Sequence, residues 1–224
     1  MQPLDPDFRT QLFEQFSRIC KALGNPHRLE LLFLLVNGEH SVDRLSHETG
    51  MAFANTSQHL QNLKRSGLIL SRRAGSTIFY RLADPSILPL LQAARSTAES
   101  RLAEVDRLLD QLYASREALP HVDFKTLQTE LDKEETLLVD VRPKNEFQDG
   151  HLPHAVSIPL NELENRLSEL SPQQNLIIIC RDMYSTLSDQ AVQILIQHGF
   201  QAARLSLGFM EWKAQGGEIV YTAY

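Results

Sequence analysis

The sequence is short of the features that mark a secreted, disulfide-bonded or membrane protein. Its 224 residues include only two cysteines, Cys20 and Cys180, one in each half of the chain. Two thiols can build neither a disulfide framework nor a four-cysteine zinc site within one chain. No apolar run approaches the roughly 18 residues that a membrane span needs, and the start lacks the layout of a secretory signal. We therefore expect a cytoplasmic protein with no membrane partner, no metal and no cofactor.

Acidic residues are also missing from one long interval. The net charge is −6, but residues 1–115 hold 13 Lys and Arg against 12 Asp and Glu, whereas residues 116–224 hold 9 against 16. Between Glu48 and Asp84 there is no acid, and five basic side chains fall in this interval. They are Lys64, Arg65, Arg72, Arg73 and Arg81. A local basic surface is what contact with DNA phosphates requires.

Two short helices about a tight turn are predicted between residues 41 and 66. Ser41 suits the N-cap of the first helix, Gly50 suits its C-terminal stop, and Gly67 closes the second helix. This order predicts a helix-turn-helix. The second helix offers polar side chains that can hydrogen-bond base edges or phosphates in a major groove. They are Asn55, Thr56, Ser57, Gln58, His59, Gln61 and Asn62.

A basic hairpin is predicted directly after the second helix. Residues 68–82 have the pattern of two strands about a turn at residues 74–76. Arg72 and Arg73 on this wing, with Lys64 and Arg65 before it, would bind the DNA backbone. A basic helical protein-interaction domain is the alternative, but the order of elements and the acid-free interval favour DNA.

Apolar residues recur at steps of three and four from Ile87 to Leu112. The spacing predicts one long helix over residues 86–113 with a continuous apolar stripe. A stripe without a partner nearby in the sequence is naturally buried against its own copy, so we expect a homodimer that binds a palindromic double-stranded DNA operator.

The segment from Phe13 to Leu82 resembles the ArsR family of winged-helix repressors. The resemblance is carried by the matching stretches Leu23-Gly-Asn-Pro-His-Arg-Leu29, Thr56-Ser-Gln-His-Leu60, Leu63-Lys-Arg-Ser-Gly-Leu-Ile69 and Phe79-Tyr-Arg-Leu82. It implies a dimeric DNA-binding repressor. The chain lacks the Cys-x-Cys pair and the dimer-helix ligands of metal-sensing relatives, and we interpret His40, Asp43 and His47 as surface residues. Cys20, on an apolar helix, is expected to be a small core residue.

After Pro120 short strands alternate with helices, which predicts an α/β sheet. Cys180 follows the predicted strand 176–179 directly, where open α/β sheets place their sites. Loop amides and the positive end of the following helix would lower the thiol pKa and make it nucleophilic. An inert buried thiol is the alternative. The predicted site comprises Cys180, Arg181, Asp182, Met183, Tyr184, Ser185 and Thr186.

Residues 124–220 resemble the rhodanese domain. The matching stretches are Leu138-Val-Asp-Val-Arg142, Glu146-Phe147, Gly150-His-Leu-Pro-His-Ala155, Ile158-Pro159, Cys180-Arg181 and Gly208-Phe-Met-Glu-Trp212. The resemblance implies a cysteine that accepts sulfane sulfur as a persulfide, and it places Asp140 and Arg142 in a supporting polar network near the loop. Typical rhodanese loops carry glycine where this chain has Met183 and often arginine where it has Ser185. Repressors fused to rhodanese domains can carry a second cysteine near position 185. Thiosulfate turnover is therefore expected to be poor.

The sequence thus predicts two domains, an α+β winged helix-turn-helix with a long dimerisation helix (residues 1–115) and a rhodanese-like α/β domain (residues 116–224). The leading hypothesis is a homodimeric transcriptional regulator, a repressor, in which a small sulfur donor or acceptor acting at Cys180 changes operator affinity. The second is an active thiosulfate or persulfide sulfurtransferase whose DNA-binding half only controls its own gene. Oxyanion chemistry such as arsenate reduction is disfavoured because residue 185 is serine instead of arginine and because the chain has no partner thiol for Cys180.

Overall fold

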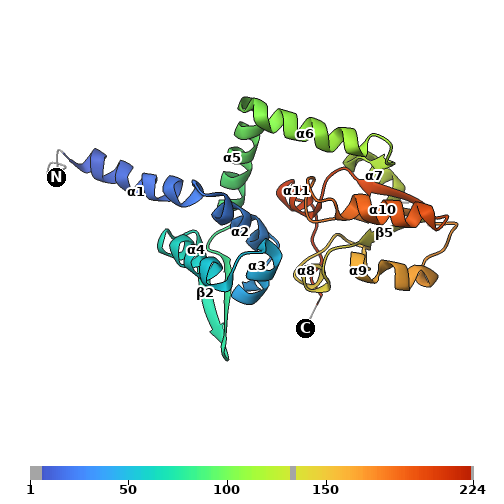
Figure 1. Ribbon diagram of the computed structural model, residues 1–224, viewed down its shortest axis with the longest axis horizontal. Helices are drawn as coiled ribbons and strands as arrows, with labels where there is room; N and C mark the ends of the chain where they lie inside the picture. Colours follow the sequence, from blue (N-terminus) through green and yellow to red (C-terminus); the bar gives the residue numbers. More distant parts are fainter. Residues whose placement is uncertain (1–6, 132–134, 223–224) are drawn as a thin grey trace. The chain divides into compact units, whose positions relative to one another are not determined.

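The chain folds into two compact units, Met1–Arg95 and Ser96–Tyr224. The computed structural model describes residues 7–131 and 135–222. It confirms the predicted combination of a winged helix-turn-helix and an α/β domain. Both units can be followed in Figure 1.

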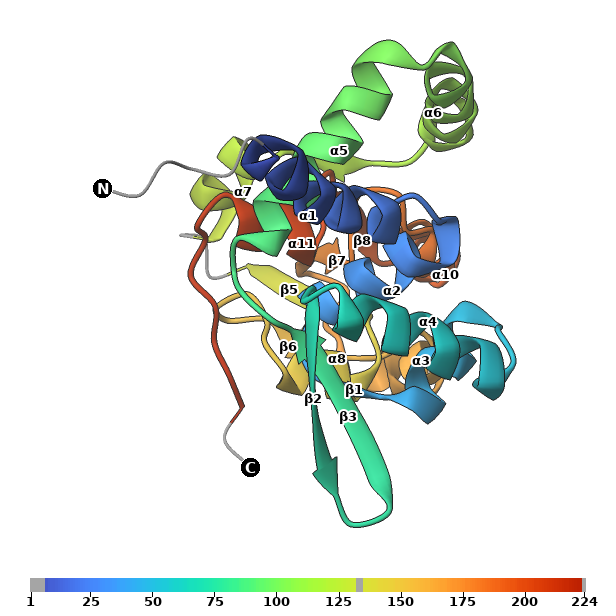
Figure 2. The same cartoon turned by 90° about the vertical axis from the view of Figure 1, so that its left-hand side faces the viewer.

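The N-terminal unit is a helical domain with a small antiparallel sheet of order β1-β3-β2. Its elements are α1 (Phe8–Leu23), α2 (Pro26–Val36), β1 (His40–Ser41), α3 (Val42–Thr49), α4 (Phe53–Arg65), β2 (Ile69–Ala74), β3 (Thr77–Leu82) and the start of α5 (Ile87–Arg101). The β2–β3 hairpin projects from the helices as the predicted wing (Figure 2). Leucines hold the unit together: Leu31, Leu32, Leu45, Leu60 and Leu63 are fully buried.

Local sequence sets the ends of the helix-turn-helix as predicted. The Ser41 hydroxyl accepts the backbone N–H of Arg44 at 3.2 Å and caps α3. Gly50 ends α3 with φ of 65°, in the left-handed region that favours glycine. Gly75, with φ of 62°, makes the turn of the wing between Ala74 and Thr77.

The predicted helix over residues 86–113 is wrong in one respect. The structure has two helices, α5 and α6 (Ala103–Arg116), separated by Leu102 in an extended conformation with φ −108° and ψ 106°. No glycine or proline stands at the break. The ends are instead packed in different units, since Ile87 and Leu91 are buried in the N-terminal unit and Arg116 is buried in the C-terminal one. Packing therefore overrides the continuous helical pattern.

The C-terminal unit is built on a parallel five-stranded sheet of order β4-β8-β7-β5-β6. Its strands are β4 (His121–Val122), β5 (Thr136–Asp140), β6 (Val156–Ser157), β7 (Asn175–Ile179) and β8 (Gln201–Leu205). Its helices after α6 are α7 (Phe124–Leu131), α8 (Lys144–Gln148), α9 (Leu160–Leu163), the 3₁₀ helix η1 (Glu164–Glu169), α10 (Leu187–Gln197) and α11 (Phe209–Ala214).

Two apolar cores cover the two faces of this sheet. Helices α9 and α10 pack on one face through Leu163, Val192 and Leu195. Helices α7 and α11 pack on the other, where Leu127 and Trp212 are buried. Because β7 lies in the middle of the sheet, its carboxyl end, and Cys180 immediately after it, lie between the two helical layers. Among residues 7–131 and 135–222, none of the helices combines the length and the apolar character that a membrane span requires.

Candidate functional site

The outer face of α4 presents part of the predicted set of DNA-contacting side chains to solvent. Asn55 and Gln58 are exposed, and Ser57, His59 and Asn62 are half-buried. Partial burial, then the charges of neighbouring Arg28 and His27, lower the His59 pKa, so this imidazole is held neutral. Gln61 is also half-buried, and its amide donates to the Tyr80 hydroxyl at 3.1 Å. The amide of Gln61 thus fastens α4 to the wing.

Thr56 is the member of the set that the structure turns inward. Its side chain is completely buried (0% exposed), and its hydroxyl donates to the carbonyl of Ala52 at 3.2 Å. The expectation that Thr56 contacts DNA is therefore wrong for this conformation. The helical period explains the error, because Thr56 shares the inward face with Leu60 and Leu63.

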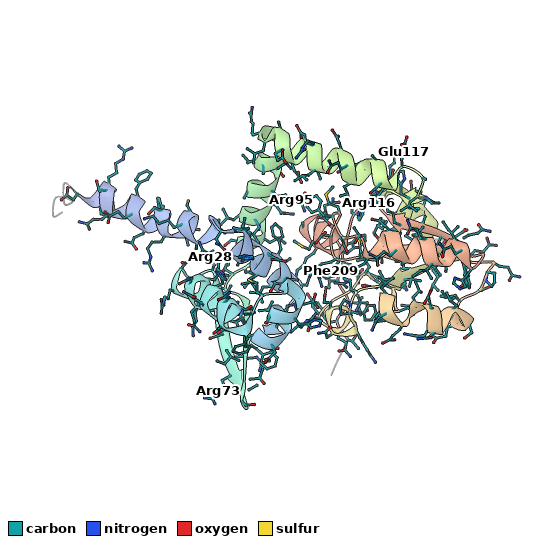
Figure 3. The ribbon with its side chains drawn as sticks, viewed as in Figure 1. Arg28, Arg73, Arg95, Arg116, Glu117 and Phe209 are labelled. Atoms are coloured by element: carbon teal, nitrogen blue, oxygen red, sulfur yellow. The ribbon has the colours of Figure 1, made fainter. Side chains whose placement is uncertain are left out.

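Basic side chains flank the exposed face of α4. Arg73 lies near the tip of the wing, where its Nε donates to the Gly75 carbonyl at 2.9 Å (Figure 3). Arg72 lies 4.9 Å over the Phe79 ring and makes an ion pair with Glu39, its Nε donating to the carboxylate at 2.6 Å. Lys64 and Arg65 are exposed at the end of α4, and Lys64 Nζ donates to the Ser71 hydroxyl. The guanidinium and ammonium groups keep access to solvent, which phosphate contact requires.

The Cys180 thiol is buried in the interior of the C-terminal unit. Its residue is 2% exposed, and Sγ donates to the Asp182 carbonyl at 3.2 Å. Burial, followed by the charges of Asp182, Glu211 and Asp189, raises the pKa of Cys180 to about 11. The predicted lowering of the Cys180 pKa is therefore wrong for this loop conformation, since the thiol is protonated at neutral pH.

The backbone amides that were predicted to bind the sulfur of Cys180 donate to carboxylates instead. The N–H groups of Tyr184 and Ser185 both donate to Asp182 Oδ1 at 2.9 Å. The Met183 N–H donates to Glu211 Oε2 at 3.1 Å, as does the Gly208 N–H at 3.0 Å. Burial, then the charge of Glu211, raises the Asp182 pKa. The loop thus has the backbone donors of an anion site, and they are bound by the carboxylates of Asp182 in the loop and of Glu211 in α11.

Arg116 holds the other side of this loop. It is 4% exposed, and its Nη1 and Nη2 donate to the carbonyls of Met183 at 2.6 Å and Ser185 at 2.8 Å. Its Nε donates to Asp189 of α10 at 2.8 Å. Figure 3 shows Arg116 at the end of α6. A buried guanidinium with three acceptors is well satisfied, so it fixes the loop firmly.

The predicted supporting residues, Asp140 and Arg142, are linked to Cys180 through Phe209. Arg142 is fully buried, is paired with Asp140 at 2.7 Å, and donates to the Gly150 carbonyl. Its guanidinium lies 4.0 Å over the Phe209 ring, and the Phe209 N–H donates to the Cys180 carbonyl at 2.9 Å. Asp140 and Arg142 thus support the end of β7 through the Phe209 ring.

Several residues around the loop were missed by sequence reasoning. Of the predicted loop residues, Arg181 is paired with Glu146 of α8, and Thr186 is exposed. Glu211 matched the rhodanese pattern, but its role as acceptor for the loop amides had no sequence signal. Arg116 and Glu99 are far from Cys180 in the chain, and only the fold brings them to the loop.

Cys20 is exposed on α1, so the prediction that it is a core residue is wrong for the single chain. Among the described residues, no group of three or more His, Cys, Asp or Glu side chains is placed to hold a metal ion.

Comparisons with known proteins match both halves of the chain. Residues 25–71 match the bacterial regulatory protein, arsR family, and residues 123–215 match the rhodanese-like domain. The HTH-type transcriptional regulator Rv0324 of Mycobacterium tuberculosis is 36% identical over 211 residues, which cover 94% of this chain and 92% of that protein.

Two further similarities are confined to one half each. A sulfurtransferase of Allochromatium vinosum is 33% identical over 101 residues, covering 44% of this chain and 92% of that enzyme. The solution structure of a homodimeric winged helix-turn-helix DNA-binding domain from Mycobacterium bovis is 35% identical, covers 45% of this chain and 94% of that domain, and has a TM-score of 0.42.

Proposed function

The chain belongs to the ArsR-type transcriptional regulators that carry a C-terminal rhodanese-like domain, and from this premise we propose that sulfane sulfur carried by Cys180 changes its affinity for operator DNA. The domain boundary that we propose between residues 115 and 116 separates the operator-binding part from the sulfur-binding part. Such a regulator acts in the cytoplasm, where the chromosome is accessible.

For DNA binding we propose that α4 lies in the major groove and that the wing follows the phosphate backbone. Asn55 and Gln58 have free access to base edges, and amide side chains can bind adenine in a bidentate manner. Arg72 and Arg73 supply the phosphate contacts, which position the protein and give the affinity its salt dependence. Arg72 must exchange Glu39 for phosphate on binding.

For assembly we propose a homodimer. Large apolar side chains are exposed on α1 and along the α5–α6 segment, and a second copy would remove them from water. They are Phe8, Phe13 and Phe16 on α1, with Leu90, Leu102, Leu108 and Tyr113 farther along the chain. The same burial would cover α1, which carries Cys20.

One observation carries the sulfur proposal: the amides of Met183, Tyr184 and Ser185, next to the buried thiol, all donate to carboxylate oxygens. Backbone donors arranged around carboxylates can bind another anion of similar size. A persulfide anion on Cys180 is such an anion. It could take over the amides that Asp182 holds in the unloaded state.

The loading step balances without an outside oxidant when thiosulfate is the donor. The Cys180 thiol first loses its proton to solvent, and the thiolate attacks the sulfane sulfur. A new S–S bond forms to Cys180 while the S–S bond of thiosulfate breaks, and its electron pair leaves with sulfite. The raised pKa of Cys180 predicts that this step is slow until the loop opens.

The test measures DNA binding and sulfur loading on the same sample. Mass spectrometry of the intact protein should show a gain of about 32 Da, the mass of one sulfur atom on a thiolate, which is lost in Cys180→Ala and kept in Cys20→Ser. Gel shifts with a duplex selected from a random pool should then give different affinities for loaded and unloaded protein. Equal affinities with confirmed loading at Cys180 would overturn regulation by this route.

A second candidate function is sulfur transfer itself, with the DNA-binding half serving autoregulation. The similarity to the Allochromatium vinosum sulfurtransferase over 92% of that enzyme favours it. Thiocyanate formation from thiosulfate and cyanide, abolished in Cys180→Ala, would support it. A rate no higher than that of buffer would exclude thiosulfate as the substrate.

A further inference from the structure

Side chains from α5 and α6 bind three successive residues of the cysteine loop. Arg116, the last residue of α6, donates to the carbonyls of Met183 and Ser185. The Tyr184 hydroxyl donates to the carboxylate of Glu99, in the last turn of α5. The loop that follows Cys180 is therefore tied at each of residues 183, 184 and 185 to the helical segment that precedes the sheet.

One peptide unit is held from both sides. The carbonyl of Met183 and the N–H of Tyr184 belong to the same planar peptide group. The carbonyl accepts from Arg116 at 2.6 Å, and the N–H donates to Asp182 at 2.9 Å. A planar group turns as a whole, so this N–H cannot be redirected to a sulfur anion on Cys180 without moving the carbonyl that Arg116 binds.

The segment bound to the loop also continues into the DNA-binding unit. Helix α5 carries Glu99 near its end, while Ile87 and Leu91 at its start are buried in the N-terminal unit. A change in how the loop holds Glu99 therefore acts directly on a helix that both units share, and a change at Arg116 acts on the adjoining helix α6. Coupling of two sites requires an element of this kind, whose state both sites can bias.

We propose that Arg116 and Glu99 are positioning residues that report the sulfur state of Cys180 to the DNA-binding unit. When a persulfide anion takes the Tyr184 amide from Asp182, the Met183–Tyr184 peptide turns, Arg116 loses the Met183 carbonyl, and the loop holds the α5–α6 segment less tightly. The inference rests on the proposed function, since it needs Cys180 to accept sulfur.

The experiment uses the full chain, inorganic polysulfide as the sulfur donor, and a duplex selected from a random pool by the unloaded wild-type protein. The main variant is Glu99→Ala, which removes the carboxylate that binds Tyr184 but leaves the Cys180 loop residues intact. Glu104→Ala is the matched control, because Glu104 is an exposed glutamate at the start of α6 whose ion pair with Arg107 stays on that helix. Arg116→Lys keeps the charge and loses the paired donors.

The readout is the ratio of DNA affinities of loaded and unloaded protein. We expect a ratio of about tenfold in the wild type and in Glu104→Ala, a magnitude typical of coupled sites. Glu99→Ala should load Cys180 normally by mass spectrometry, yet its ratio should fall below about threefold. Hydrogen exchange in residues 96–116 should rise on loading in the wild type and stay unchanged on loading in Glu99→Ala.

The outcomes separate the two proposals. A wild-type ratio retained by both Glu99→Ala and Arg116→Lys, with normal loading, would overturn the link and leave the proposed function standing. A wild-type ratio of one despite full loading would overturn both. A purely structural role of Arg116 predicts lower stability with an unchanged ratio, so a reduced ratio in a folded, loaded Arg116→Lys protein supports the link. If Arg116→Lys fails to fold, the ratio of DNA affinities in Glu99→Ala decides whether the link exists.

Discussion

The two units present their functional groups in opposite ways. In the N-terminal unit, Gln58 and Arg73 extend into solvent, and DNA can reach them without a change of fold. In the C-terminal unit, the Cys180 thiol is buried and the loop amides around it are bound by carboxylates. If the proposed functions hold, DNA binding requires little rearrangement, whereas sulfur loading of Cys180 requires the loop to open.

The largest expected effect concerns the protonation of Cys180, and it tests whether the thiol of the C-terminal unit is buried in solution. In a Cys20→Ser background, alkylation of Cys180 by iodoacetamide should rise about tenfold per pH unit, and so about a thousandfold from pH 7 to pH 10, because the thiolate is the nucleophile and the pKa is about 11. Asp182→Asn should speed the reaction at pH 8, since it removes a charge that raises the pKa.

The control for this experiment is Glu164→Gln, an exposed acid on η1. Its alkylation rate should match that of the parent protein. A rate that levels off near pH 7 would show that the thiol is already ionised there and that the loop lies open in solution.

The next effect tests whether the two units have separate cores. Leu60→Ala in α4 and Leu195→Ala in α10 remove side chains that are fully buried, so each should cost roughly 2–5 kcal/mol of stability. Hydrogen exchange of buried amides should rise only in the unit that carries the substitution. Ile196→Ala, beside Leu195 but exposed, is the matched control with a change of about 0.5 kcal/mol or less. An equal rise in hydrogen exchange in both units would contradict the proposal that they have separate cores.

A smaller effect should separate base reading from burial along α4. Gln58→Ala should reduce the preference for one base of the operator by about 1–3 kcal/mol, measured with duplexes that differ at single positions. Thr56→Ser, on the inward face of the same helix, should leave the base preference unchanged. A loss of preference in the serine variant would place Thr56 at the DNA after all.

The smallest effect concerns the wing. Arg73→Gln should weaken binding to all duplexes alike, by about tenfold or less, and should lower the slope of log affinity against log salt by about 0.9. Arg107→Gln, exposed on α6, is the control with an unchanged slope. If Arg73→Gln changed base preference instead, the wing would be reading sequence.

Much of the fold could be predicted because its signals are local. The cap by Ser41, the stop at Gly50 and the wing turn at Gly75 depend on neighbours within a few residues. The position of Cys180 after a buried strand is equally local. Each of these predictions needed only the period of a helix or strand and the chemistry of a turn.

The site itself was predicted less well because burial and charge are not local. The sequence contains the loop from Cys180 to Thr186 but does not show that Asp182 and Glu211 hold its amides, with the second acid 31 residues beyond Cys180. The same limit explains Cys20, which lies on an amphipathic helix yet is exposed in the single chain.

The order of residues along the chain was enough to predict a winged helix-turn-helix joined to a rhodanese-like α/β domain with one cysteine after a central strand. Folding, in contrast, buries the thiol and keeps it protonated, breaks the helix at Leu102, and brings Arg116 and Glu99 to the cysteine loop. The reason is physical: hydrophobic period and capping act between neighbours, whereas a pKa and a buried ion pair depend on groups that only folding brings together.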